Sequence, residues 1–296
     1  MLKGLTLTPP VIGRISIGKV VERNGKRLPE KDDEFTLTSQ VQSKGQWLPH
    51  PMDSKLRKPN EKLHSIPVKL LFDAPDLNLR AQYSLFDRQT GRPLCVGNGE
   101  SCKRVQNGQL ESLPCPSPEA CSLGANNQCK PYGRLNVQIS DDEELGSFIF
   151  RTTGFNSIRT LSARLHYFAA VSGNRLSTLP LELRLRAKST TQSHRTPIYY
   201  VDLVVRNGMS LTEAIAEAVE RYTLRQQSGF DQKALDNAAR AGFAAGAFEE
   251  NEEDGAVVME EFYPDAIPQA RHTISDGLAP TLAEKMAGKL ESSVAP

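Results

Sequence analysis

Four cysteines close together in the first half of the chain constrain its fold more than any other feature. Within 28 residues stand Cys102, Cys115, Cys121 and Cys129, separated largely by Gly, Pro, Asn and Ser. The spacing C-x12-C-x5-C-x7-C suits a tetrahedral zinc site with four thiolate ligands, although it lacks the paired C-x2-C of the most specific zinc motifs. Two disulfides, or unliganded thiols, are the alternatives. Cys95, seven residues upstream, is either an alternative ligand or a small buried thiol.

The expected compartment favours zinc over disulfides. The N-terminal sequence has no apolar core long enough for a signal peptide, and no run of about 18 apolar residues could span a bilayer. We therefore expect a cytoplasmic protein with no membrane partner. A reducing compartment and the odd number of five cysteines both fit a metal better than a full disulfide set. The predicted zinc segment, residues 95–130, has too little apolar surface to order itself without ligands closing on a metal.

The net charge of +1 conceals an uneven distribution. Residues 246–296 carry eleven acidic and three basic residues, a balance of −8, so the remainder of the chain carries +9. A basic body with an acidic tail is common among proteins that handle nucleic acid, because Lys and Arg neutralise phosphates. An ordinary mixed surface is the alternative, since +9 over 245 residues is modest.

Alternating apolar and polar residues predict strands along the first half of the chain. The candidates are residues 11–21, 35–41, 66–72, 79–86, 134–139 and 146–151. Asn24-Gly25 predicts a tight hairpin turn after the first of them. Residues 43–64 are polar and interrupted by proline, so we expect a long loop there.

The pattern becomes helical after residue 151. Apolar residues at positions 158, 161, 165 and 168 share one helix face, and the helix should begin near Asn156 and end at Gly173-Asn174. Strands at 181–185 and 198–205 follow, and the capping box Ser210-Leu-Thr-Glu213 begins another helix. Residues 231–247 are rich in alanine and expected to be helical.

This order of elements predicts an α+β protein. A β-rich domain over residues 1–151, carrying the zinc segment, is compatible with a five-stranded barrel of the oligonucleotide-binding (OB) type, although other small barrels fit as well. An α+β region over residues 152–227 should pack on it. Residues 228–296 should be weakly helical and then form a largely disordered acidic tail.

No sequence motif points to catalysis. The chain contains no G-x-x-x-x-G-K-[ST], no G-x-S-x-G and no H-E-x-x-H, and its five histidines are scattered. A site closed by four cysteines leaves no open coordination position, which favours a structural zinc over that of a hydrolase. We therefore predict that the protein is not an enzyme and takes no small-molecule substrate.

Basic and aromatic residues suggest a nucleic-acid surface. Three cations at alternate positions along one strand, Arg184, Arg186 and Lys188, point the same way, and others stand in the polar segment around Trp47. The Trp47 ring can stack on a base or serve as a hydrophobic latch. The predicted nucleic-acid contacts are Trp47, Lys55, Arg57, Lys58, Arg151, Arg184, Arg186 and Lys188.

Several of these segments resemble one known family. The run Cys102-Lys-Arg, Cys115-Pro, Cys121, Cys129-Lys-Pro-x-x-x-Leu135, followed by Phe150-Arg-Thr-Thr-Gly-Phe-Asn-Ser-Ile158, is similar to the phage recombination directionality factors. A weaker likeness includes residues 12–19 and 181–185, so that the resemblance covers residues 10–205. It implies a zinc-containing accessory protein of a phage or integrative element, which binds a large serine integrase and switches excision on. Only the four cysteines carry over, as metal ligands.

Two hypotheses follow. The first is a non-enzymatic accessory protein of mobile-element DNA recombination, with structural zinc and a surface for a recombinase or integrase. The second is a single-stranded DNA-binding protein of a mobile-element recombination or replication module, in which the basic and aromatic strands contact DNA. Single-stranded DNA is a more natural ligand for that surface than a specific duplex sequence.

Overall fold

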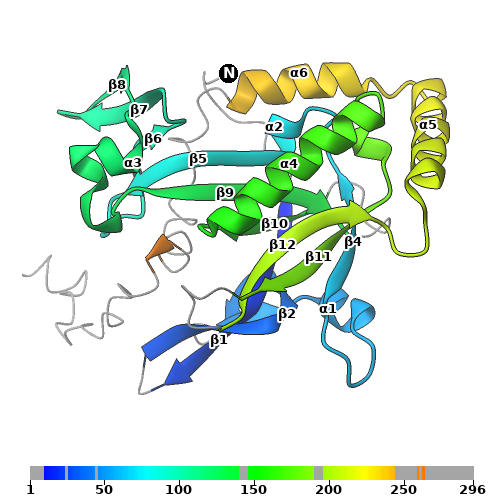
Figure 1. Ribbon diagram of the computed structural model, residues 1–296, viewed down its shortest axis with the longest axis horizontal. Coiled ribbons are helices and arrows are strands. Elements are labelled where there is room, and N and C mark those ends of the chain that lie inside the picture. The colour runs from blue at the N-terminus through cyan, green and yellow to red at the C-terminus, as the bar shows by residue number, and fades with distance from the viewer. Residues whose placement is uncertain are drawn as a thin grey trace, which may run out of the picture.

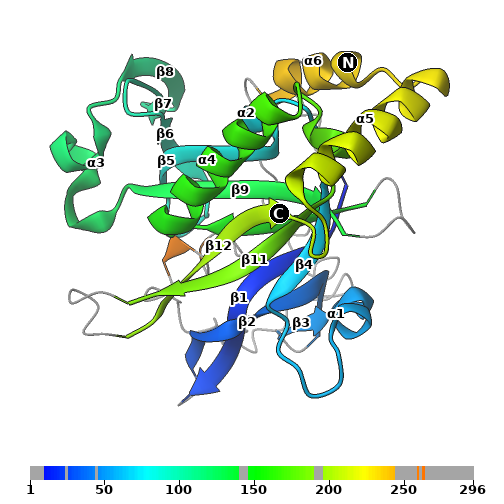
Figure 2. The ribbon, with the colours of Figure 1, turned by 45° about the vertical axis from the view of Figure 1, so that its right-hand side comes forward.

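The computed structural model describes residues 10–23, 26–43, 46–139, 146–189, 196–243, 259, 262 and 263. Within these residues the chain forms an α+β fold, as predicted, in which helices pack against a large sheet (Figures 1 and 2). The acidic segment from residue 244 onward lies outside the described residues except at positions 259, 262 and 263. None of the helices in the described part has the length and apolar content that a membrane span requires.

The strands are β1 (Val11–Arg23), β2 (Lys26–Ser43), β3 (Gln46–Pro49), β4 (Ser65–Leu70), β5 (Leu79–Phe86), β6 (Pro93–Gly97), β7 (Ser101–Gln106), β8 (Gln109–Pro114), β9 (Lys130–Gln138), β10 (Ser147–Thr152), β11 (Leu181–Lys188) and β12 (Ile198–Val205). The helices are α1 (Pro51–Leu56), α2 (Pro75–Asn78), α3 (Ser117–Ala120), α4 (Phe155–Val171), α5 (Leu211–Gln227) and α6 (Gln232–Phe243), with 3-10 turns η1 (Ser122–Asn127) and η2 (Leu176–Thr178). The segment 43–64, expected to be a loop, therefore contains a strand and a helix.

The strands join in one branched sheet. Its main path is β3-β2-β1-β10-β9-β5-β6-β7-β8, and β4 joins β11 and β12 to β9. β1 and β10 run parallel, whereas β9 is antiparallel to its neighbours β10, β5 and β4. Within the described strands, β3 and β8 lie at opposite ends of the path and do not pair. The sheet therefore stays open, and the barrel-like, OB-type closure expected for residues 1–151 is not formed. The reason is that extra strands extend both edges, β1–β3 on one side and β6–β8 on the other.

Strand register sorts the side chains into alternating rows. One apolar row crosses five neighbouring strands and consists of Leu37, Ile15, Phe150, Leu135 and Leu79. All five belong to the main hydrophobic core, together with Leu161 and Leu165 of α4. Because side chains alternate along a strand, the next row points to the opposite face of the sheet. α4 lies across the strands in Figures 1 and 2 and covers the apolar face.

The core also includes side chains from the segment after residue 151. β11 pairs with β4, where Leu183 lies opposite Ile66, and both residues are fully buried. Leu203 of β12 and Ala214 and Ala218 of α5 belong to the same cluster. Burial of these side chains fixes the α+β region on the β-rich part, while the boundary near residue 151 stays a prediction.

Both long helices begin close to their predicted positions. α5 starts with the predicted capping box: the Ser210 hydroxyl accepts a bond from the Glu213 amide (3.3 Å), and the Glu213 carboxylate accepts one from the Ser210 amide (2.7 Å). α4 starts at Phe155 with Gly154 as its N-cap, two residues before Asn156, the predicted cap. Asn156 instead accepts a hydrogen bond from Lys188 Nζ (2.7 Å), so its side chain ties α4 to β11.

The buried side chain of Asn78 stabilises the turn between β4 and α2. Its Oδ1 accepts bonds from the amides of Leu71 and Phe72 (3.1 Å each), and its Nδ2 donates to the carbonyls of Phe72 (2.7 Å) and Ala74 (3.0 Å). Asn78→Ala should lower the free energy of unfolding by about 3 kcal/mol, because it leaves buried backbone groups without partners. Urea unfolding would measure this change, with the exposed Asn207→Ala as the matched control. A loss below about 1 kcal/mol would contradict the prediction.

Candidate functional site

All five cysteines lie in one part of the fold, residues 93–130, which we call the cysteine module. It consists of β6, β7, β8, α3, η1 and the entry to β9, and it extends the sheet beyond β5 (Figure 1). The predicted zinc segment, whose glycine, proline, asparagine and serine are typical of loops, is therefore built largely of regular elements. A two-residue turn joins β7 to β8, and both turn residues, Asn107 and Gly108, have left-handed backbones, with φ of 51° and 76°. Asn-Gly is the preferred sequence for such a hairpin.

Strand register gathers the thiols on one face of this module. In the β6–β7 pair, Cys95 lies opposite Arg104 and Gly97 lies opposite Cys102, so the two cysteines and the arginine share a face. Cys95 and Cys102 are buried and pack together with the partly buried Cys115 and Cys129. Burial, and after it the neighbouring Cys95 thiol, raises the pKa of Cys102 to about 11.

Cys129 is close enough to the other four cysteines to be influenced by each of them. Burial is the main cause that raises the pKa of Cys129 to about 12, and the charges of Cys95, Cys115, Cys121 and Cys102 add to it. The structure therefore brings together the four predicted ligands and also Cys95. All five are free cysteines.

Arg104 supplies a positive charge beside this cluster. Its Nη2 lies 3.8 Å from Cys121 Sγ, and a hydrogen bond to Cys95 is the largest of the causes that raise the pKa of Arg104. A zinc ion bound by four thiolates carries a net charge of −2, and a nearby guanidinium offsets part of that charge. Sequence analysis missed Arg104, because its pairing with Cys95 follows only from the register of β6 and β7.

The donor atoms of this cluster fit zinc by their chemistry, since thiolates are its preferred protein ligands. Among the described residues, however, no three His, Cys, Asp or Glu side chains form a group that could hold a metal ion as they stand. Binding would draw the sulfurs to about 2.3 Å from a common centre. The zinc site at Cys102, Cys115, Cys121 and Cys129 therefore stays a prediction.

The predicted nucleic-acid residues of β11 already have partners. Arg184 forms an ion pair with Glu182, and Arg186 forms one with Asp202 (3.3 Å), whose other oxygen pairs with Arg164 (3.0 Å). Both acids are buried, with side chains 3% and 5% exposed. These acids neutralise much of the positive charge that the cations at alternate positions of β11 suggested. Lys188 donates a hydrogen bond to Asn156.

The second predicted group lies on β3, α1 and the turn after it. The Arg14 guanidinium stacks on the Trp47 ring, 4.2 Å from its centroid, so this ring is engaged within the protein. Arg57 pairs with Asp53 (3.1 Å) and Glu34, and Lys58 pairs with Glu61 (3.7 Å). Lys55 is exposed on α1. Whether either group contacts nucleic acid stays a prediction.

Arg151 belongs to a cationic row that sequence analysis missed. It lies opposite Arg134 on β9, and Arg134 in turn lies opposite Arg80 on β5. This arginine row is on the sheet face opposite to the apolar row, because its residues are one position away along each strand. Burial lowers the pKa of Arg80 to about 10, and the charge of Arg151 contributes. Arg134 is buried, and the Arg80 guanidinium lies 4.6 Å from the Phe243 ring centroid, so these two arginines are engaged within the protein.

Comparison with known proteins adds one finding. A family model described as "Gp3-like: Recombination directionality factor-like" matches residues 12–206, which run from β1 to the end of β12 and include the cysteine module and the arginine row. α5, α6 and the acidic C-terminal segment lie beyond the match. No curated protein and no solved structure matches the chain.

Proposed function

Because this chain belongs to the recombination directionality factor-like family, we propose that it is a non-enzymatic accessory protein of a phage or another mobile element. It binds the element's recombinase, a serine integrase, and favours excision over integration. The family match over residues 12–206, two thirds of the chain, carries this proposal. The match favours a recombinase partner over the single-stranded DNA-binding role.

An accessory protein can change the direction of a reaction without taking part in its chemistry. A partner that binds one conformation of the recombinase more tightly than another shifts the population toward the first. A tenfold shift needs only about 1.4 kcal/mol of differential binding. The open sheet, with its covered apolar face and its arginine row, provides a rigid platform for such binding.

Zinc would have a structural role in this protein. Cys102, Cys115, Cys121 and Cys129 would hold the ion, with Cys95 as the alternative ligand. They come from β7, the end of β8, the end of α3 and the entry to β9, so one ion would connect four consecutive parts of the module. Such a site orders a segment that buries little apolar surface.

DNA contact is a further part of the proposal, and Arg151 is its best-supported residue. Among the predicted contacts, Arg151 is the one that strand register places in a row with two other arginines, Arg134 and Arg80. A phosphate bound there would contribute to salt-dependent binding.

The test is recombination with purified components. The full chain, added to the element's integrase, should stimulate recombination between the two excision sites by at least about tenfold and inhibit integration. Arg151→Gln should weaken any binding to the recombining DNA and reduce its dependence on salt. The proposal fails if the chain neither binds the integrase nor changes which pair of sites recombines.

A further inference from the structure

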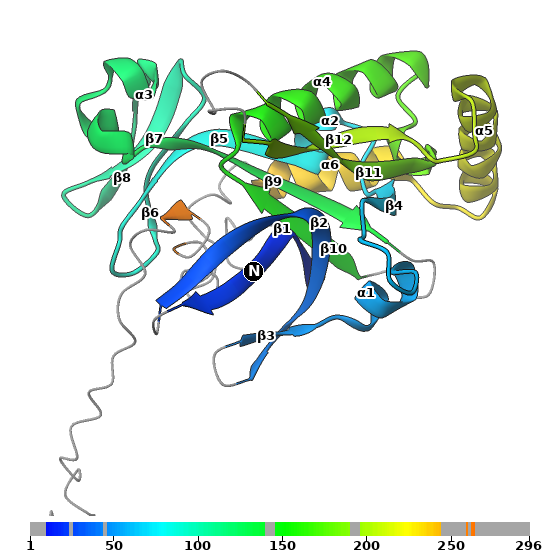
Figure 3. The same cartoon turned by 60° about the horizontal axis from the view of Figure 1, so that its bottom comes forward.

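Three described residues of the acidic C-terminal segment, Met259, Phe262 and Tyr263, pack against the body of the protein. We call them the aromatic strap. Phe262 is fully buried and Tyr263 is 4% exposed, although they follow α6 by about twenty residues. Figure 3 shows this short orange segment beside the β5–β6 hairpin. The strap lies beyond the family match, whereas the surface that it covers lies within it.

Aromatic rings form the floor of the surface that holds the strap. The Phe262 ring makes edge-to-face contacts with Phe86 of β5 (4.8 Å between centroids) and Tyr132 of β9 (5.7 Å). Phe86 and Tyr132 also contact one another. Edge-to-face pairs at these distances contribute beyond the area that they bury. The surface therefore presents a ready-made seat for one aromatic side chain.

Polar and charged groups fix the strap in a defined orientation. The Tyr263 hydroxyl lies 3.0 Å from the Gln128 carbonyl, to which it donates, and Lys130 Nζ donates to the Phe262 carbonyl (3.0 Å). The Arg88 guanidinium lies 4.7 Å from the Tyr263 ring centroid, and Lys130 lies near both rings. In the sequence the two aromatic residues stand between Glu260-Glu261 and Asp265, so cations hold an aromatic pair within an acidic stretch.

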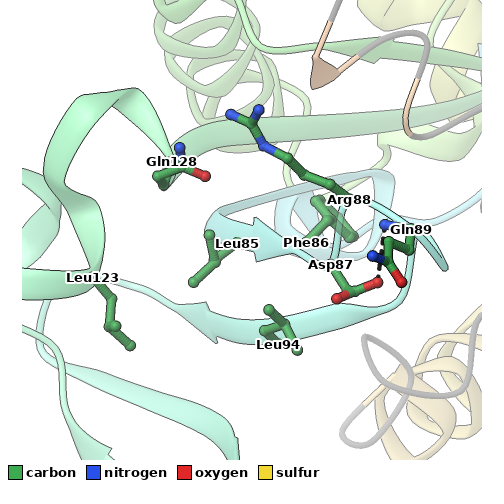
Figure 4. A pocket seen from close by; sticks show the side chains of 8 residues that line it. All are labelled: Leu85, Phe86, Asp87, Arg88, Gln89, Leu94, Leu123 and Gln128. Atoms are coloured by element: carbon green, nitrogen blue, oxygen red, sulfur yellow. Dashed lines mark hydrogen bonds between the residues drawn. The ribbon is translucent and has the colours of Figure 1, made fainter. Parts of the chain in front are cut away.

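A pocket adjoins the strap on the side of the cysteine module. It has a volume of about 420 Å³ and shares Phe86, Arg88 and Gln128 with the strap site. Leu85, Leu94 and Leu123 give it an apolar lining (Figure 4). A ligand longer than the strap could therefore occupy both the strap site and this pocket.

We propose that the strap site and this pocket together form a docking groove for a partner protein, which inserts an acidic peptide segment with two adjacent aromatic residues. The strap of this chain is the internal occupant that such a segment displaces. Recognition of a peptide carbonyl by Lys130, and of a tyrosine hydroxyl by a main-chain carbonyl, favours a peptide over a nucleic acid. A tethered strap competes at an effective concentration in the millimolar range, so the groove admits only partners that bind more extensively or at high local concentration.

The test uses the full chain and a fluorescent peptide of residues 255–268. The double variant Phe262→Ala/Tyr263→Ala frees the groove, so the peptide should bind it at least about tenfold more tightly than it binds the unchanged chain. A peptide with the same two alanines is the matched control and should not bind. Equal binding of the peptide to both proteins, or to neither, would overturn the proposal. Tyr263→Ser, which keeps the buried Phe262, gives an intermediate affinity and provides a second measurement if the double variant does not fold.

Two further arms identify the partner class. An oligonucleotide that binds the freed groove in place of the peptide would overturn the peptide assignment in favour of nucleic acid. The last arm rests on the proposed function. If the integrase contains an acidic segment with two adjacent aromatic residues, the double variant should bind the integrase more tightly than the unchanged chain does. The peptide titration contains no integrase, so its result stands apart from the proposed function. Failure of both proteins to bind the integrase would count against that function alone.

Discussion

If the proposed zinc site exists, replacing Cys129 with serine is expected to remove most of its zinc and to loosen the cysteine module. A serine hydroxyl is a poor zinc ligand, and structural zinc sites of this kind contribute on the order of 10 kcal/mol at neutral pH. Cys129 stands at the entry to β9, so its loss would release this end of the module from the other three predicted ligands. Zinc content, measured by mass spectrometry, should fall from about one ion per chain to below about 0.2.

Cys95→Ser is the matched control, because it makes the same chemical change at the cysteine outside the predicted ligand set. It should keep about one zinc ion per chain. Hydrogen exchange should increase in residues 93–130 of the Cys129 variant, while the core strands β9 and β10 stay protected. The assignment of the four ligands is wrong if Cys95→Ser loses the ion and Cys129→Ser retains it. If the unchanged chain itself contains no zinc, the prediction of a zinc site is wrong.

Local patterns predicted some of the regular elements and missed others. The strand over residues 79–86 was predicted with the bounds that β5 has, because its apolar and polar residues alternate. The capping box at Ser210 predicted the start of α5 for an equally local reason. The helix α1 was missed, because its cap is His50, whose Nδ1 accepts a bond from the Met52 amide (3.1 Å), and histidine is not among the usual capping residues.

The overall arrangement depends on pairings between distant strands, which local patterns do not encode. The barrel prediction failed because β1–β3 and β6–β8 extend opposite edges of the sheet. The strands β6–β8 were not predicted, because cysteine, glycine and proline are typical of loops. The Asn107-Gly108 dipeptide, however, is typical of a hairpin turn. The arginine row likewise exists only through register, since its members are separated by as many as 71 residues in the sequence.

The candidate functional residues also divide into those that local sequence reveals and those that depend on strand pairing. The cysteines could be found from the sequence because their number and spacing are unusual for a chain of this kind. Arg184 and Arg186 looked like a cationic stripe, because the pairing of β11 with β12, which brings Asp202 beside them, is not visible along the sequence. A cation in a strand is therefore weak evidence for a nucleic-acid surface until its neighbours on the adjacent strands are known.

Gly97→Ala is expected to disturb the thiol cluster without removing any sulfur. A Cβ at position 97 would lie 2.7 Å from Cys102 Cβ and 2.9 Å from Cys115 Sγ, both closer than atoms of these kinds approach. The added methyl group must push apart two of the predicted zinc ligands, and its third neighbour, the Ser101 carbonyl at 3.0 Å, belongs to the backbone. Overpacking of this kind costs about 1–3 kcal/mol. We therefore expect zinc affinity to fall by at least about tenfold, since 1.4 kcal/mol corresponds to that factor.

Competition with a chromogenic chelator would measure this affinity. Gly154→Ala is the matched control: its added Cβ meets the Thr152 hydroxyl at 3.1 Å, on a side chain that can rotate, and the position lies outside the cysteine module. This control should leave zinc affinity unchanged. An unchanged affinity in Gly97→Ala would mean that Cys102 and Cys115 do not need their present separation to bind the ion. In that case the sulfurs would reach the metal by a rearrangement of β7 and β8, and the register that places them on one face would not determine the site.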